Sequence, residues 1–336
     1  MQDKILLAHG SGGKLSHDLI EKLFLPHFDN PILARLDDSA LIELESGARL
    51  AFTTDSYVVS PLFFPGGDIG KLAICGTIND LAMSGAKPLY MSASFIIEEG
   101  SPVTDLKRIV LSMRKVAEES GVKIVAGDTK VVGEGTADGI FINTTGVGLI
   151  PEGVQISGAN AKPGDMIIIS GTLGDHGIAI MSQREGLEFA SSLESDCAPL
   201  QGLVARMVEA SPEIHCLRDP TRGGLATTLN EMAAQSQVGF LIEEKKIPVQ
   251  DEVRGVCELL GLDPLYLANE GKLVAVLPPH TADRVLEAMR GHPYGKASVV
   301  IGQVLSDHPG HVIMKTRLGA HRLLEMAVGE LLPRIC

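Results

Sequence analysis

Apolar residues in the first half of the chain follow two alternating spacings, one typical of strands and one typical of helices. Strands are predicted at "ALIEL", "LAFTTDSYVV", "LYMSASFII", "KIVAGDTKVV" and "IFINTTGVGLI", and helices near residues 68–84 and 103–120. The second helix is the better marked, because its apolar residues form one stripe and Gly121 supplies a left-handed cap. This alternation indicates an α/β or α+β domain.

The second half repeats the mixture after a Gly- and Pro-rich boundary at "PEGVQISGANAKPGD". Its predicted strands are "DMIIIS", "VGFLIEE", "KLVAVL" and "SVVIGQVL", with helices between them. A chain of 336 residues suggests two domains of about 150 residues each. We therefore predict a glycine-rich arm and helix at 1–35, an N-terminal domain at 36–153, a C-terminal α/β domain at 154–328 and a mobile tail at 329–336.

The charge balance narrows the classes of function. The chain carries 29 basic and 42 acidic side chains, a formal charge of −13, which disfavours a nucleic-acid or anionic-membrane partner. It has no run of about 18 apolar residues and no signal-peptide layout at its start, so we expect a cytoplasmic protein. Five scattered cysteines fit reduced thiols, and without CxxC or paired-His spacing we expect no zinc or iron–sulfur site.

Aspartates flanked by small residues recur through the predicted N-terminal domain, in "LDDSA", "TTDS", "TINDLA" and "AGDTK". Asp80 is the most unusual, since it falls on the apolar stripe of its predicted helix, where an unpaired carboxylate is costly. Each aspartate alone is equally well explained by an early helix end or by bonds to nearby backbone. Together they indicate a cage for Mg²⁺ ions that bridge a polyphosphate, formed by Asp37, Asp38, Asp55, Asp80 and Asp128.

Three glycine-rich stretches offer backbone amides to an anion. "HGSGGK" at 9–14 adds a His and a Lys, although it lacks the spacing of a Walker loop and a disordered arm explains it equally well. "SGTLGDHG" at 170–177 and "RDPTRGGL" at 218–225 each precede a predicted helix. Either can also be a tight strand-to-helix turn, and for "SGTLGDHG" that interpretation is preferred.

The sequence closes on "GELLPRIC", with a thiol on its last residue, Cys336. A reactive side chain on a frayed terminus is either an accident or a carrier that must move. We expect the other four cysteines to be small apolar residues of the core or surface.

The ordered set of these motifs resembles the two-domain ATP-dependent enzymes that include aminoimidazole ribonucleotide synthetase, selenophosphate synthetase and thiamine-monophosphate kinase. Within them, "HGSGGK", "DDSA", "TDSYVVSPLFFPGGDIGKLAICGTINDLAMSGAKP", "GDTKVV", "SGTLGDHG", "RDPTRGG", "NEGK" and "PRIC" closely resemble the hydrogenase expression/formation protein E (HypE) family, from the first residue to the last. The resemblance implies an aminoimidazole ribonucleotide synthetase-like fold, with an N-terminal sheet that dimerises, a C-terminal α/β domain and an ATP cleft.

The resemblance also implies a maturation enzyme that makes the cyanide ligands of nickel–iron hydrogenases. In that family a carbamoyltransferase (HypF-like) loads a carboxamide onto the C-terminal Cys, which is dehydrated to a thiocyanate with ATP and Mg²⁺. The cyano group then passes to iron on a scaffold complex of two maturation proteins (HypC–HypD-like). An extended segment 329–336 reaches roughly 26 Å at about 3.3 Å per residue, enough to swing between a partner's site and its own cleft.

Carried over by position, the resemblance assigns Cys336 as the carrier, with Lys130 and Glu270 at the amide. Lys130 is equally suited to bind the γ-phosphate, and Glu270 to terminate an element by bonding Arg or backbone. The resemblance implies nucleotide contacts from His9, Gly10, Gly12, Gly13, Lys14, Asp55, Asn79, Asp80 and Asp128.

Two alternatives stay open. One is another enzyme of the same family, but selenophosphate synthetases usually carry Cys or selenocysteine in the N-terminal glycine loop, which "HGSGGK" lacks, and small-molecule kinases have no need of a terminal Cys. The other is a non-catalytic scaffold that binds nucleotide to switch partners. Its signature would be ATP binding without turnover.

Overall fold

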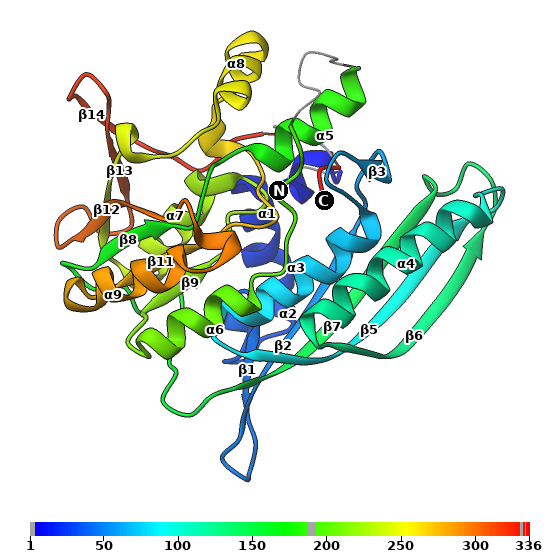
Figure 1. Ribbon diagram of the computed structural model, residues 1–336, viewed down its shortest axis with the longest axis horizontal. Coiled ribbons are helices and arrows are strands. Elements are labelled where there is room, and N and C mark those ends of the chain that lie inside the picture. The colour runs from blue at the N-terminus through cyan, green and yellow to red at the C-terminus, as the bar shows by residue number, and fades with distance from the viewer. Residues whose placement is uncertain (1–3, 187–192, 330–331, 333) are drawn as a thin grey trace.

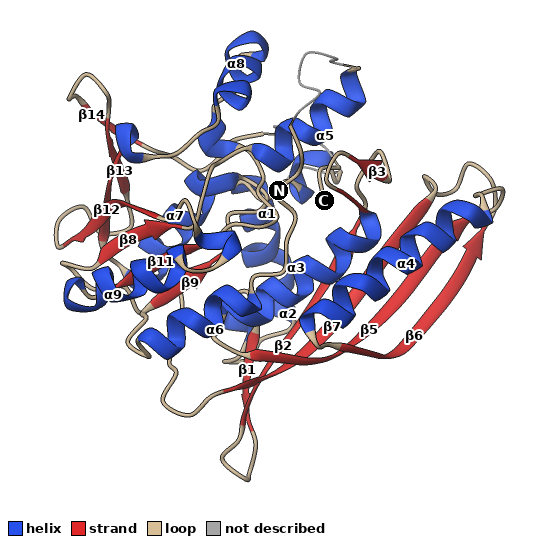
Figure 2. Ribbon diagram, viewed as in Figure 1, coloured by secondary structure: helices blue, strands red, loops and turns tan. Residues whose placement is uncertain are grey.

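The computed structural model describes residues 4–186, 193–329, 332 and 334–336. It contains two mixed sheets, each with helices packed on it (Figures 1 and 2). The first sheet has the strand order β1-β2-β7-β5-β6 and the second the order β14-β13-β10-β12-β8-β11-β9. The described part of the chain contains no helix that is long and apolar enough to cross a membrane.

The first sheet consists of β1 (Ala40–Glu43), β2 (Arg49–Tyr57), β5 (Lys87–Glu98), β6 (Lys123–Val132) and β7 (Ile140–Ile150). Neighbouring strands are antiparallel except β5 and β6, which are parallel, and β6 forms one edge. Helices α3 (Ile69–Met83) and α4 (Val103–Ser120) cover one face (Figure 1). A short hairpin, β3 (Phe63–Phe64) and β4 (Gly67–Asp68), leads into α3.

Local sequence explains where these helices begin and end. Asp68 is the N-cap of α3, because its Oδ1 accepts hydrogen bonds from the backbone amides of Gly70 (2.8 Å) and Lys71 (3.0 Å). Helix α4 ends at Gly121, whose φ of 69° confirms the predicted left-handed cap. Nearly every residue of α3 is buried, so this helix is the centre of the first domain rather than an amphipathic cover.

The face of the first sheet opposite α3 and α4 is uncovered, and we call it the open face. Register places Phe52 and Tyr90 on it, each opposite Val147, and alternation along β5 adds Ile96. These three side chains are between 40% and 49% exposed. Asp128 and Lys130 of β6 project from the same face, because Asp128 lies opposite Ser94 and Lys130 opposite Ile96.

The second sheet consists of β8 (Met166–Ile169), β9 (Cys216–Arg218), β10 (Gly239–Glu243), β11 (Val274–Leu277), β12 (Val299–Leu305), β13 (Val312–Lys315) and β14 (His321–Leu323). Its helices are α5 (Asp175–Glu185), α6 (Gln201–Ala210), α7 (Gly224–Ser236), α8 (Asp251–Leu260) and α9 (Pro279–Arg290). The core on one face includes α7, and the core on the other includes α6 and α9. The hydrophobic pattern predicts β8, β10, β11 and β12 but not β9, β13 and β14; of the missed strands, β9 and β14 have three residues each and are too short to show an alternation.

The two domains share a core. Leu81 and Ala82 of α3 pack in one buried cluster with Leu203 and Met207 of α6. Asn79 adds polar contacts across the same boundary: its Oδ1 accepts from the amide of Leu200 at 2.8 Å, and its Nδ2 donates to the carbonyl of Ala198 at 3.1 Å. The domain boundary is therefore a packed interface, and it fixes both walls of the site described next.

The N-terminal arm runs along the second domain. It contains the short turns and helices η1 (Leu7–Gly10), α1 (Lys14–Leu19), η2 (Ile20–Phe24), α2 (Leu25–His27) and η3 (Leu33–Arg35). The amide of Lys14 donates to the carbonyl of Ala327 at 3.0 Å. Gly13 is needed there, because an added Cβ would collide with the same carbonyl.

Candidate active site

A cleft of about 490 Å³ lies between the domains and is bordered by the N-terminal arm. Its walls come from β2, from α3 and from the loop that joins β9 to α7. Nine of the predicted site residues line it: His9, Gly10, Gly12, Asp37, Asp38, Asp55, Asp80, Glu270 and Cys336. The structure therefore brings together residues that are up to 327 positions apart in the sequence.

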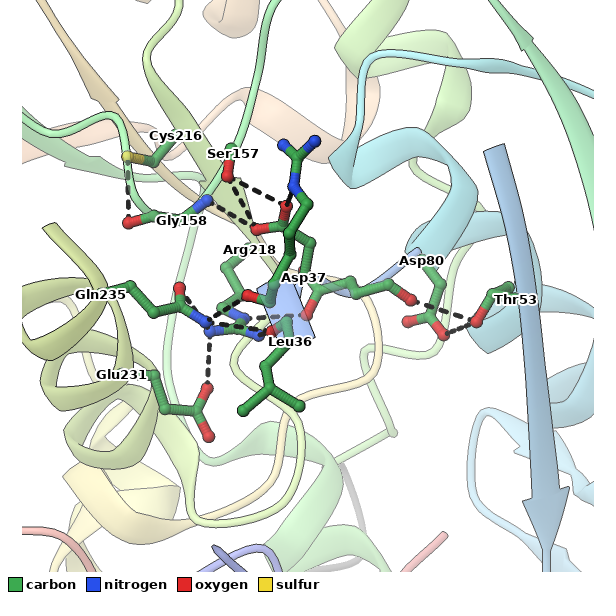
Figure 3. A network of polar contacts seen from close by, with 12 residues as sticks. Leu36, Asp37, Thr53, Asp80, Ser157, Gly158, Cys216, Arg218, Glu231 and Gln235 are labelled. Atoms are coloured by element: carbon green, nitrogen blue, oxygen red, sulfur yellow. Dashed lines mark hydrogen bonds and ion pairs between the residues drawn. The ribbon is translucent and has the colours of Figure 1, made fainter. Parts of the chain in front are cut away.

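Carboxylates crowd one end of the cleft. Burial and the charges of Asp55, Asp219 and Asp38 raise the pKa of Asp80 well above its ordinary value. The pKa of Asp219 rises for the same reasons, burial first and Asp38 next. Asp80 has one hydroxyl partner, Thr53, whose Oγ1 donates to Oδ2 at 2.9 Å (Figure 3). Arg218 offsets only part of this repulsion between the carboxylates, and a divalent ion would offset more of it.

The cluster does not form a ready-made metal site. Within the residues that the structure describes, no group of three or more His, Cys, Asp or Glu side chains has the spacing of a metal centre. Oxygen donors nevertheless suit Mg²⁺, which commonly takes one or two carboxylates and completes its shell with phosphate oxygens and water. The donor set fits a metal that arrives with a polyphosphate, and the ligand role of each aspartate remains a prediction.

Asp37 and Asp38 differ in their surroundings although they are adjacent. Asp37 is anchored to the second domain, because both its oxygens accept from Ser157 Oγ and Oδ1 also accepts from the amide of Gly158 at 2.9 Å (Figure 3). Asp38 faces the cluster, and burial raises its pKa to about 6 even though the Arg218 guanidinium opposes the shift. Asp37 is thus the positioning member of the predicted pair.

Arg218 organises a buried ionic network behind the cluster. Its Nε donates to Asp38 at 2.8 Å. Its NH1 lies 2.9 Å from Glu231 (Figure 3). The other oxygen of Glu231 contacts His17 Nε2 at 2.6 Å, and this hydrogen bond raises the pKa of His17. Because His17 belongs to α1 and Glu231 to α7, the network ties the N-terminal arm to the second domain.

The loop between β9 and α7 supplies site residues that our residue assignments omitted. Asp219, Thr221 and Arg222 of "RDPTRGG" all line the cleft. Gly12 lets the arm approach this loop, because an added Cβ would lie 2.6 Å from the Cβ of Arg222. The signal was present in the sequence, since the motif places two glycines before a helix, and Gly223 and Gly224 indeed adopt φ values of 80° and 60°.

The end of the chain is docked in the cleft. The carbonyl of Cys336 accepts from the amide of Val58 at 3.1 Å, and that of Arg334 accepts from Ser60 at 3.2 Å. Ile335 is 4% exposed and joins the core of the first domain. Burial raises the pKa of the Cys336 thiol to about 12, so the docked sulfur is a neutral thiol.

His176 holds this docked segment from the side of the second domain. Its Nε2 donates to the carbonyl of Ile335 at 2.8 Å, while its Nδ1 accepts from Ser195 Oγ at 2.8 Å. Burial lowers the pKa of His176, which keeps the imidazole in this neutral tautomer. "SGTLGDHG" is therefore a strand-to-helix turn, as preferred from the sequence, but one that also carries a contact to the tail.

Glu270 faces the thiol from the second domain. The side chain is 3% exposed, and its Oε1 is buried without a hydrogen-bond partner. Burial raises its pKa well above the ordinary value, with further contributions from Cys197 and Asp219. Among the residues that the structure describes, no Arg or backbone group hydrogen-bonds to this carboxyl group, in contrast to the alternative that the sequence left open. The backbone of Glu270 is engaged by Asp196, Asn79 and Ala198.

Five predicted residues do not line the cleft of their own chain. Asp128 and Lys130 pair with each other on the edge strand β6, with Nζ and Oδ2 2.8 Å apart and both side chains more than 60% exposed. Asn79 points into the domain interface, where backbone groups occupy its amide. Gly13 and Lys14 contact Ala327 instead.

The remaining cysteines confirm the sequence interpretation. Cys75, Cys197, Cys216 and Cys257 are all buried and unbridged. Cys336 is thus the most accessible thiol of the described chain.

Comparisons with known proteins agree with this geometry. The domain described as "AIR synthase related protein, N-terminal domain" matches residues 36–150, and its C-terminal counterpart matches residues 162–315. The chain is 56% identical to the carbamoyl dehydratase HypE of Cupriavidus necator over 333 residues, 99% of this chain and 95% of that protein.

Two solved structures are similar over nearly the whole length. A hydrogenase maturation protein HypE in complex with ATP is 54% identical, with a TM-score of 0.84, covering 99% of this chain and all of that one. The HypE chain of a HypE–HypF complex is 51% identical, with a TM-score of 0.87, covering 92% of this chain and 99% of that one. The two-domain fold that the motifs imply is confirmed.

Proposed function

The chain belongs to the AIR synthase related family and, within it, to the HypE carbamoyl dehydratases, and on this premise we propose that it dehydrates an S-carboxamide on Cys336 to a thiocyanate with ATP. The product supplies the cyanide ligands of a nickel–iron hydrogenase during its maturation. One observation carries the assignment to this site: the thiol of Cys336 lines the same cleft as the carboxylate cluster.

The chemistry explains why ATP and a carboxylate cluster accompany the thiol. An amide oxygen is a poor leaving group, so the reaction first moves a phosphoryl group onto it: the oxygen attacks the γ-phosphorus and ADP leaves. The nitrogen then loses its protons, the C–O bond breaks with its electron pair going to phosphate, and the C≡N bond forms. The carboxamide thus loses the elements of one water: its oxygen leaves within the phosphate, and its two protons leave from the nitrogen.

The carboxylates are suited to hold the metal that accompanies ATP. We assign Mg²⁺ to Asp38, Asp55, Asp80 and Asp219, whose oxygens face the cleft. Bound there, Mg²⁺ would neutralise charge that builds up on the phosphates. Asp37 has a positioning role, because its oxygens accept hydrogen bonds from Ser157 and Gly158 of the second domain and so hold the neighbouring Asp38 in place.

Glu270 is our candidate for the group that removes a proton from the amide nitrogen. A general base works best when its pKa lies near the working pH, and burial moves the pKa of Glu270 upward from its ordinary value. The residue lines the cleft, and its Oε1 has no hydrogen-bond partner that would compete with the amide proton. Neither Asp128 nor Lys130 assists within one chain, because both lie outside this cleft.

A second copy of the chain gives Asp128 and Lys130 a function. They project from the open face together with the exposed Phe52, Tyr90 and Ile96, an apolar surface that a second sheet would cover. We assign a homodimer through this face, in which β6 of one copy brings Lys130 toward the cleft of its twin. The role of Lys130 at the amide or the γ-phosphate depends on that arrangement.

The docked tail implies two positions for Cys336. In the cleft the thiol is neutral and only partly exposed, which suits dehydration but not loading by another protein. We assign a carbamoyltransferase of the HypF type as the loading partner, in line with the HypE–HypF complex of a relative. A scaffold of the HypC–HypD type would accept the cyano group. We also expect the protein to act in the cytoplasm, as predicted from the sequence.

Phosphate release separates this enzyme from a scaffold that only binds nucleotide. The carbamoyl-loaded protein mixed with Mg–ATP is expected to release one phosphate per loaded Cys336 in a single burst. Protein that has not been loaded should bind ATP without a burst. A loaded protein that holds ATP and releases none would favour the scaffold.

A further inference from the structure

Arg222 is the cationic side chain with the strongest electrostatic influence on Cys336. Among the charges around the thiol, the guanidinium of Arg222 has the largest effect on its pKa and is the one that opposes Glu270, Asp55 and Asp219. The influence is mutual, since Cys336 is also the first cause of the raised pKa of Arg222. Both side chains line the cleft.

The position of Arg222 is fixed by backbone on both sides. Its NH1 donates to the carbonyl of Gly10 at 3.1 Å, so the arm holds one corner of the guanidinium. Gly12 packs directly against its Cβ and carbonyl, at distances that no side chain on residue 12 would permit. The following Gly223 and Gly224 adopt left-handed φ values and turn the chain into α7 directly after Arg222.

The hydrogen-bonding capacity of Arg222 is largely unused. A guanidinium has five N–H donors, and in the described structure Gly10 is the hydrogen-bond acceptor of Arg222. Arg218 provides a contrast within the same motif, because Asp38, Glu231 and the carbonyl of Leu36 all accept from it or pair with it. Arg218 therefore has a structural role, whereas Arg222 presents free donors to whatever occupies the cleft beside the thiol.

We infer that Arg222 binds the carboxamide oxygen on Cys336 and then the phosphoryl group that this oxygen receives. The inference rests on the proposed function and extends it, because it assigns a catalytic residue that faces the reacting oxygen. Aspartates cannot take this part, since like charge repels the oxygen as negative charge develops on it. A planar, permanently charged fork suits an oxygen that becomes a phosphate ester and then leaves as phosphate.

Arg222 acts here without changing its own protonation. It donates hydrogen bonds to the amide oxygen while that oxygen attacks the γ-phosphorus, and to the phosphate oxygens while the C–O bond breaks. The proton of the nitrogen goes to the base, and the electron pair of the C–O bond goes to the departing phosphate. Loss of a preorganised donor of this type lowers rates by about 10²–10³-fold.

A different role would leave the same contacts. If Arg222 only closes the arm through Gly10, its removal would loosen the arm and weaken ATP binding, with no direct effect on the carboxamide. The test therefore needs a readout of the carboxamide itself that does not require ATP.

Isotope-edited infrared spectroscopy provides that readout. Cys336 is loaded with [¹³C]carbamoyl phosphate by the carbamoyltransferase, and the C=O stretch is measured without nucleotide in the wild type, in Arg222→Ala and in the control Arg114→Ala. Arg114 lies on α4, more than 70% exposed and paired with Glu118. A hydrogen bond from a guanidinium weakens the C=O bond, so the stretch is expected at lower frequency in the wild type and control than in Arg222→Ala.

Single-turnover dehydration completes the test. We expect Arg222→Ala to lose about 10²–10³-fold in rate with its loading unchanged, and to recover partly with added guanidinium chloride at millimolar concentration but not with sodium chloride. Arg222→Lys keeps the charge but not the planar fork, so its dehydration rate should lie between those of the wild type and Arg222→Ala. An unchanged stretch, an unchanged rate or the absence of guanidinium rescue would each overturn the inference. Failure of the wild type to accept the carbamoyl group would instead contradict the proposed function.

Discussion

The imidazole of His176 donates a hydrogen bond to the carbonyl oxygen of Ile335, 2.8 Å away, and so fixes the backbone directly before the thiol. His176 lies in the first turn of helix α5 of the second domain, whereas Ile335 is packed in the core of the first. The same ring lies edge-on to Phe64 of the first domain, with ring centroids 5.5 Å apart. A single buried side chain therefore connects both domains to the docked tail.

Removal of this contact should release the tail. His176→Ala leaves the carbonyl of Ile335 without its donor, which costs about 1–3 kcal/mol when the group stays buried. The balance should shift toward undocked protein by about 5- to 150-fold, and alkylation of Cys336 by iodoacetamide should accelerate accordingly. Peptide mass analysis reports the modified cysteine. Gln183→Ala, an exposed position of the same helix, serves as control, and equal alkylation rates in the two variants would refute the role of His176.

Asp80→Asn should separate metal binding from loading. The variant is expected to accept the carbamoyl group on Cys336 and to fail in dehydration, because the cluster loses a ligand for the metal. In metal-free protein the same change removes a charge that repels Asp55, Asp219 and Asp38, so its melting temperature should rise. Mg–ATP should then stabilise the variant less than the wild type. Normal dehydration by Asp80→Asn would contradict the metal role.

The contact between His17 and Glu231 should make stability depend on pH. Glu231 raises the pKa of His17 above 6.5, so the folded state binds the proton more tightly than the unfolded state. The stabilisation is fully present below pH 6.5 and is lost as the pH rises through the higher folded value. His17→Gln should therefore lower the free energy of unfolding by about 0.5–1 kcal/mol at pH 6 and by less at pH 8.5, since His17 is partly exposed.

Urea unfolding at the two pH values measures this difference. His280→Gln is the matched control, because His280 contacts Glu213 at 3.2 Å on the surface, with 66% of its side chain exposed. A loss of stability in His17→Gln that is the same at both pH values would show that the charge of His17 is not involved.

Mixed dimers test whether Lys130 acts in the cleft of the twin. Lys130→Ala and Asp80→Asn are each expected to be inactive alone, but a mixed dimer contains one cleft with an intact Asp80 and an intact Lys130 from the other copy. Random pairing of equal amounts gives about one functional site in four. The fraction of functional sites is measured as the dehydration activity of the coexpressed pair, compared with the activity of each variant alone. No recovery in isolated mixed dimers would place Lys130 outside the twin's cleft.

The fold could be predicted from the sequence where elements are long. Helix α4 shows one apolar stripe along its 18 residues and a glycine cap at its end, and local physics determines both. Strands such as β9 and β14 contain three residues each and exist because longer strands pair with them. Their formation depends on tertiary contacts, which no local pattern reports.

The site likewise contains residues that the sequence indicates and features that depend on the tertiary fold. The residue types of Asp38, Asp55 and Asp80 indicated a cation site, since carboxylates beside small residues are costly unless they are used. Asn79 was assigned with Asp80, yet consecutive helix residues point about 100° apart, so helical geometry alone predicts that both cannot face one cleft. The position of β6 at a sheet edge, which takes Asp128 and Lys130 out of the cleft, depends on strand order and was not available from the sequence.

The most direct test of the account is the mass of the C-terminal peptide. The protein is treated with the carbamoyltransferase and carbamoyl phosphate, with and without Mg–ATP, beside Cys336→Ala, which should bind ATP normally and gain no mass. The account predicts a carbamoyl adduct on Cys336 that loses one water only when Mg–ATP is present. A tail that stays unmodified, or an adduct that keeps its water while ATP is bound, would contradict it.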